Sequence, residues 1–103
     1  MIKGYLFQVD TPIGITVTTT QDYWNLIEKK HPEINGKLLL AKHALRMPDT
    51  IRQSKTDKQV LLFYRKINGY WICVVAKCNT KDGFVITSYL TDKIKEGVKI
   101  WPN

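Results

Sequence analysis

The stretch VLLFYRKINGYWICVVAKCNTKDGFVITSYL, residues 60–90, decides the fold of this chain. It holds three runs rich in β-branched and aromatic residues, each typical of a β-strand. The runs span residues 60–66, 70–77 and 84–90. Asn68-Gly69, between the first two runs, is the strongest short signal for a two-residue hairpin turn. Asp82-Gly83 precedes the third run with the same turn chemistry, so the stretch predicts an antiparallel meander.

Two helices are expected before this meander. Either Thr18 or Thr19 can begin the first helix, since each stands three residues before a suitable capping partner. That helix should end near His31, because Pro32 disfavours helical geometry in the residue before it. The second helix covers about residues 37–46, where leucines and alanines form one apolar stripe.

The predicted fold class is α+β. Residues 5–9 and 15–18 should form a short N-terminal hairpin, which packs with the two helices on an antiparallel meander sheet of about four strands. We expect residues 1–103 to form a single domain. Both faces of the meander are apolar at their centres, so the second face needs a cover. The tail, residues 94–101, is the expected cover, with a homodimer as the alternative.

Positive charge is concentrated in the middle of the chain. The 103 residues include 16 Lys and Arg against 9 Asp and Glu, a formal net charge of +7. Residues 31–66 hold eight of the basic and three of the acidic side chains. Such an excess favours a polyanionic partner or makes a lysine-rich surface. Apolar runs are too short for a membrane span, and no secretory signal is visible, so a cytoplasmic location is expected.

The turns also predict which side chains of the meander meet. Two-residue turns at both positions would put Arg65 opposite Ile72, and Lys77 opposite Ser88. The resulting faces group Arg65 with Thr87 and Tyr89, and group Tyr64 with Lys66, Lys77 and Ser88. A change of one residue in the second loop would reverse the last strand.

The available side chains favour proton transfer and the binding of an anion by cationic groups over metal or nucleotide cofactors. No phosphate loop or metal-ligand spacing is present, and Cys73 and Cys78 fit neither a CxxC nor a zinc pattern. Histidine, cations and hydroxyls in a basic chain suit cleavage of RNA through its 2′-hydroxyl, without a cofactor. His31 is the candidate base or acid, because an imidazole titrates near working pH; the alternative is a helix cap. Arg65 could clamp a phosphate, or it is a solvated strand end.

The other candidate groups are weaker signals taken one by one. They are the hydroxyls of Thr87 and Ser88, the phenols of Tyr64 and Tyr89, and the ammonium groups of Lys66, Lys93 and Lys95. Hydroxyls can donate to phosphoryl oxygens, tyrosines can stack a base or donate a proton, and lysines can contact phosphates. Each group also has an ordinary alternative. The hydroxyls can reflect strand propensity, the tyrosines can pack at the edge of the core, and the lysines can be plain surface charge.

Several short motifs together resemble a known family. They are YWNLIEKKHPE, MPDTIRQ, VLLFYRK, YWICVVAK, GFVITSYLTDK and IW, within about residues 15–101. They are similar to the phage-associated barnase–EndoU–colicin–RelE-like nuclease domains. The resemblance implies a metal-independent ribonuclease of the small toxin type, with helices packed on a four-stranded antiparallel sheet. The family's functional positions correspond here to His31, Tyr64, Arg65, Thr87, Tyr89 and Lys93.

The chain departs from the family pattern in two ways. Ser88 stands where a plain small residue is common, and the chain begins at Met1 rather than trailing a large phage protein, which favours a free-standing protein. An endoribonuclease is therefore the leading hypothesis, with RNA and a cognate inhibitor protein as partners and a monomer or homodimer as the assembly. The alternative is a non-catalytic RNA-binding or protein-binding module on the same fold, encoded by a mobile element.

Overall fold

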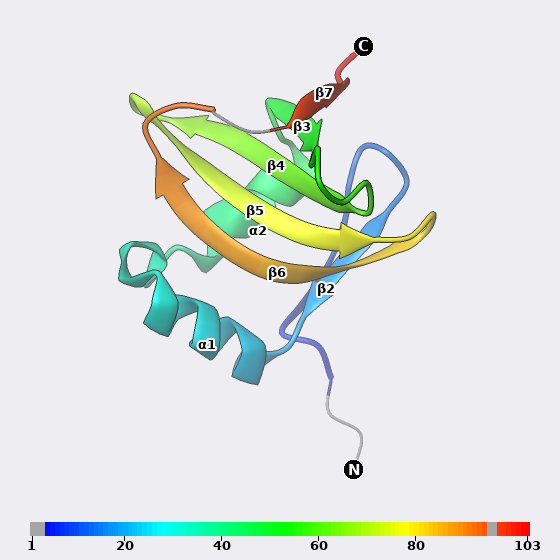
Figure 1. Ribbon diagram of the computed structural model, residues 1–103. Coiled ribbons are helices and arrows are strands. Elements are labelled where there is room, and N and C mark those ends of the chain that lie inside the picture. Colours follow the sequence, from blue (N-terminus) through cyan, green and yellow to red (C-terminus); the bar gives the residue numbers. More distant parts are fainter. Residues whose placement is uncertain (1–3, 95–96) are drawn as a thin grey trace.

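The computed structural model describes residues 4–94 and 97–103, and within them a single mixed sheet of seven strands packs with two α-helices and a 3₁₀ turn (Figure 1). The elements are β1 (Phe7–Asp10), β2 (Thr16–Thr19), α1 (Gln21–Lys30), η1 (Pro32–Ile34), α2 (Leu38–Arg46), β3 (Thr50–Gln53), β4 (Val60–Ile67), β5 (Tyr70–Cys78), β6 (Asp82–Thr91) and β7 (Val98–Trp101). The strand order is β1-β2-β6-β5-β4-β3-β7. The α+β class and the N-terminal hairpin are confirmed, but the sheet is larger than the expected four strands, and β2 pairs with β6 in parallel.

The first turn of the meander is the one that the sequence predicts. Asn68 and Gly69 have φ angles of 42° and 95°, the left-handed values that a two-residue hairpin turn requires. Ile67 pairs with Tyr70 across this turn, and Arg65 pairs with Ile72 as expected.

The second turn differs from the prediction. It is formed two residues earlier, at Thr80-Lys81 within Asn79–Asp82. The Asn79 side chain accepts hydrogen bonds there from the backbone of Lys81 and Asp82 at 2.8 and 2.7 Å. Gly83 lies within β6, opposite Cys78. A Cβ at Gly83 would stand 2.7 Å from the Cys78 Sγ, so the glycine permits close approach there and does not form the turn.

A β-bulge then reverses the last part of β6. Ala76 pairs with Val85, but Val75 pairs with Thr87, so Ile86 is an extra residue. Lys77 consequently lies opposite Phe84, and Ser88 lies opposite Val74. The predicted pairing of Lys77 with Ser88 is wrong. So is the predicted face that Arg65 shares with Thr87 and Tyr89, because one inserted residue exchanges the two sides of a strand.

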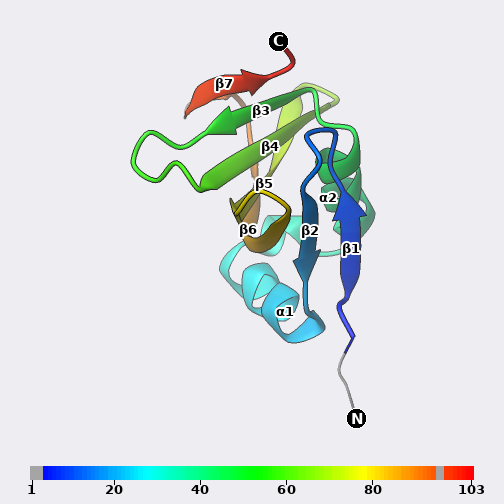
Figure 2. The ribbon, with the colours of Figure 1, turned by 90° about the vertical axis from the view of Figure 1, so that its right-hand side faces the viewer.

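The helices and the β1–β2 hairpin, which belongs to the same sheet, lie on one side of the central strands, and this side is here called the covered face. α2 packs on β4 and β5, and Figure 2 shows α2 and the β1–β2 hairpin on the same side of these strands. The buried core on this face includes Trp24, Ile34, Leu45, Phe63, Ile72, Val74 and Val85. α1 lies beside the part of β6 that β2 leaves unpaired, where the Tyr23 hydroxyl donates to the backbone oxygen of Ile86 at 3.0 Å. This bond satisfies one carbonyl of the bulge.

The opposite face, here called the open face, carries a smaller apolar cluster. Its buried members are Leu62, Tyr64, Cys73 and Val75. The expected cover by the tail is wrong for most of its described length, because β7 pairs with β3 and extends the sheet at its edge. Ile94 alone among the described tail residues packs against this cluster. Among the described residues, no helix is long and apolar enough to cross a bilayer.

Candidate functional site

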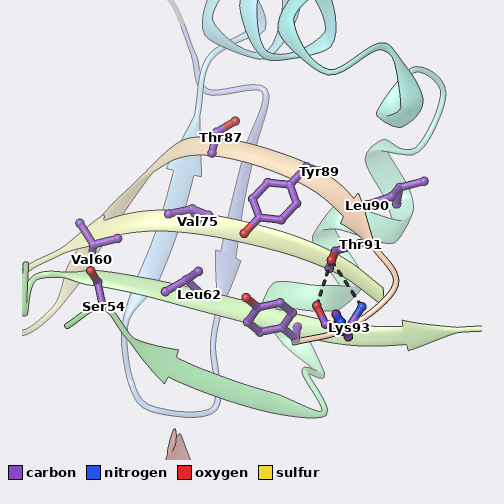
Figure 3. A pocket seen from close by; sticks show the side chains of 10 residues that line it. Ser54, Val60, Leu62, Val75, Thr87, Tyr89, Leu90, Thr91 and Lys93 are labelled. Carbon is purple, nitrogen blue, oxygen red and sulfur yellow. Dashed lines mark hydrogen bonds between the residues drawn. The ribbon is translucent and has the colours of Figure 1, made fainter. Parts of the chain in front are cut away.

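The open face is hollowed by a pocket of about 490 Å³ (Figure 3). It is lined by Ser54, Val60, Leu62, Tyr64, Val75, Thr87, Tyr89, Leu90, Thr91 and Lys93. Its floor is apolar, while tyrosines, hydroxyls and a lysine stand around it. This combination of an apolar floor with a few convergent polar groups is typical of a ligand site.

Strand pairing orders the side chains of the open face into rows. One row runs Lys99, Arg52, Leu62, Val75, Thr87 from β7 to β6. The next row runs Thr50, Tyr64, Cys73, Tyr89, and a third runs Lys66, Trp71, Thr91. Directly paired residues point to the same side of a sheet. The β6 end of the three rows is formed by Thr87, Tyr89 and Thr91. The opposite end of the first and third rows carries the cations Lys99, Arg52 and Lys66.

His31 does not line this pocket itself, but its ring lies beside Tyr89, which does. It forms the C-cap of α1, as the sequence predicts, and its backbone N–H donates to the Ile27 oxygen at 2.8 Å. Its ring lies 5.8 Å from the Tyr89 ring, centre to centre, and Nδ1 is 3.5 Å from a Glu33 carboxylate oxygen. The side chain is 26% exposed, so the imidazole is positioned by two neighbours and still reaches solvent.

Tyr89 links His31 to the floor of the pocket. Figure 3 shows its ring reaching from β6 over β5. Burial, with smaller contributions from the neighbouring Cys73 thiol and Tyr64 phenol, raises the pKa of Tyr89 well above its ordinary value. The phenol therefore stays protonated at physiological pH and can serve as a hydrogen-bond donor.

Thr87 and Lys93 complete the polar lining on the β6 side. The Thr87 Oγ1 is shielded from solvent and has no hydrogen-bond partner among the described residues. Lys93 follows β6 in a tight turn, in which the Thr91 hydroxyl donates to the Lys93 oxygen at 2.9 Å (Figure 3). A buried hydroxyl without a partner and an exposed lysine beside one pocket are suited to bind an anionic group.

Two of the sequence candidates lie away from the pocket. Arg65 is on the covered side of β4, and its guanidinium donates to the Met47 oxygen at 2.6 Å, just beyond α2. A cation at a helix C-terminus stabilises that end of the helix. Ser88 is fully buried on the covered side, where it donates to the Cys73 oxygen at 2.8 Å.

The remaining candidates differ in whether they lie at the pocket. Tyr64 lines the pocket. Lys66 is on the open face but at its end, with its Nζ 5.6 Å from the centre of the Trp71 ring. Lys95 lies outside the described residues. His43, the other histidine, is exposed on α2.

Sequence reasoning missed Arg52, Ser54 and Lys99. Ser54 lines the pocket from the loop after β3. Arg52 faces the open side because β3 pairs with β4, and Lys99 lies beside it because β7 pairs with β3. Ser54 lies in a polar loop whose sequence does not indicate a binding role. The pairing of β3 with β7 joins segments distant in the chain, and no local sequence pattern predicts it. Within residues 4–94 and 97–103, no three His, Cys, Asp or Glu side chains are grouped as metal ligands.

Comparison of the chain with protein-family models, curated proteins and solved structures gives no match.

Proposed function

We propose that this chain is a metal-independent endoribonuclease that acts in the cytoplasm and cleaves RNA by attack of the 2′-hydroxyl on the adjacent phosphate. The observation that carries the proposal is the contact of the His31 ring with Tyr89, which lines the pocket together with hydroxyls and a lysine. The pocket is large enough for a nucleotide unit, and its tyrosines offer surfaces for base stacking. The resemblance of the sequence motifs to small nuclease domains points the same way.

The proposed mechanism assigns one group of this site to each step of the reaction. His31 takes the proton of the 2′-hydroxyl, and the 2′-oxygen bonds to phosphorus. Tyr89 and Thr87 donate hydrogen bonds to the phosphoryl oxygens, where negative charge develops. The bond from phosphorus to the 5′-oxygen breaks, and that oxygen takes a proton from the Lys93 ammonium group. The products are a 2′,3′-cyclic phosphate and a free 5′-hydroxyl, and solvent restores the two protonation states.

The test is incubation of the purified protein with RNA in EDTA. We expect fragments ending in 2′,3′-cyclic phosphate, and His31→Ala should lower the cleavage rate about a hundredfold to ten-thousandfold. His43→Ala is the matched control, because it removes the other histidine at an exposed position on α2. Equal cleavage by both variants, or no cleavage of any RNA pool by the wild-type protein, would refute the proposal.

A non-catalytic RNA-binding module is the second candidate. It is favoured by the position of Arg65, which leaves the pocket without the guanidinium that was expected to stabilise the phosphorane. Binding that weakens steeply with salt, without any product, would support this candidate instead.

A further inference from the structure

Buried polar atoms without partners point to a second site on the open face. In the described part of the chain there are three such side-chain atoms, namely Thr19 Oγ1, Arg52 Nε and Thr87 Oγ1. Two of the three, on Arg52 and Thr87, belong to one cross-strand row, which runs from β7 to β6. Native proteins rarely leave a buried donor unpaired, so each such atom requires an explanation.

Charge at the Arg52 end of this row indicates what would bind there. Lys99 pairs directly with Arg52, so two cations stand side by side at the edge formed by β3 and β7. A guanidinium presents several donors in a fixed fork that matches phosphate oxygens, and an adjacent ammonium adds charge. Juxtaposed like charges repel each other, and a bound anion relieves that repulsion.

The distance along the row separates this pair from the pocket. Arg52 lies three strands from Thr87, and at the usual strand spacing this is about 14 Å. This is longer than the step between neighbouring phosphates of a single strand. A phosphate at Arg52 would therefore belong to a different nucleotide from the one held beside Thr87 and Tyr89. The residues between them, Leu62 and Val75, form an apolar floor.

We propose that Arg52 and Lys99 form a second phosphate subsite, so that a single RNA strand crosses the sheet along this row. The inference rests on the proposed function in taking RNA as the ligand, but it concerns binding and not the chemical step. It implies that affinity depends on substrate length. A strand that reaches from the pocket to Arg52 gains the second contact, whereas a dinucleotide does not.

The test measures binding of a non-cleavable, fluorescent 2′-O-methyl RNA hexanucleotide by anisotropy over a range of salt concentrations. Arg52→Gln should weaken binding about tenfold at low salt and reduce the slope of log affinity against log salt by about 0.7. Lys99→Gln should act similarly, and because Lys99 is exposed, this variant does not depend on Arg52 being dispensable for folding. Arg46→Gln is the matched control, since Arg46 is exposed on α2.

A labelled dinucleotide of the same chemistry is the second arm. We expect the Arg52 and Lys99 variants to bind it as the wild-type protein does. Equal effects on both lengths, or wild-type salt slopes in both variants, would overturn the subsite. If the wild-type protein binds the hexanucleotide with the expected slopes yet never cleaves unmodified RNA, the ribonuclease proposal fails and the subsite stands. If it binds no RNA, both fail.

Discussion

The two faces of the central strands differ in composition although they share the same backbone. On β4, Leu61 and Phe63 enter the covered core, while Leu62 and Tyr64 face the pocket. The covered face is apolar and packed against helices. The open face adds phenols, hydroxyls and cations to a smaller apolar cluster. Side chains alternate between the two faces of a strand, so neighbouring positions of one strand serve different purposes. One position contributes to stability, and the next contributes to the proposed activity.

The largest expected effect on this division comes from the covered face. Phe63→Ala should reduce the free energy of unfolding by about 3–5 kcal/mol, because Phe63 is fully buried and its loss leaves a cavity. Urea unfolding measures this loss. Cleavage per folded molecule should remain unchanged, since Phe63 does not line the pocket. A variant that stays folded yet has lost most of its specific activity would show that the two faces do not act separately.

A matched pair of threonines sharpens the comparison. Thr87→Val removes an unpaired buried hydroxyl from the pocket, and Thr19→Val removes one from β2, in the N-terminal hairpin. Both variants should be as stable as the wild-type protein or more stable by up to about 1 kcal/mol, because no hydrogen bond within the protein is lost. Only Thr87→Val should also slow RNA cleavage, by about tenfold. Equal activities of the two variants would remove Thr87 from the site.

Local signals in the sequence were sufficient for much of the fold. The positive φ angles at Asn68 and Gly69 follow from the preference of Asn-Gly for a two-residue turn. The end of α1 at His31 follows from the proline that comes after it. The bulge at Ile86 follows from no such local signal. The backbone oxygen of Ile86 accepts a hydrogen bond from Tyr23, which is 63 residues away along the chain. No local pattern distinguishes an inserted residue of this kind from an ordinary strand position.

The candidate site was predictable to a similar degree. His31, Tyr64, Thr87, Tyr89 and Lys93 were named, and the structure gathers them on or beside one pocket. Residue type alone could not separate them from Arg65 and Ser88, because the side of a strand depends on register. Arg52 and Lys99 became neighbours through the pairing of β3 with β7, which the sequence did not reveal.

The bulge offers a smaller test of how the open face is built. Tyr23→Phe removes the hydroxyl that donates to the Ile86 oxygen and keeps the ring that packs edge-on against Phe84. We expect stability to fall by about 1 kcal/mol, the usual net value of one hydrogen bond. Cleavage should fall with it only if the bond fixes Thr87, the next residue along β6. Thermal unfolding and single-turnover cleavage separate these two effects.

The smallest effect concerns the two thiols, one on each side of β5. Both Cys73 and Cys78 are buried, and burial raises the pKa of the Cys78 thiol to about 11. Because the thiolate is the reactive form, Cys78 should react slowly with a disulfide reagent at pH 8 and rapidly once the protein is unfolded. The unfolding free energy should decrease as pH rises from about 9 towards 11, since the unfolded chain ionises this thiol first. Cys73 lies beneath the pocket. In the Cys78→Ala variant, where Cys73 is the remaining thiol, its reaction with the reagent should be equally slow. Fast reaction of Cys73 in the folded protein would mean that the open face admits solvent below its tyrosines, contrary to the packing described for this face.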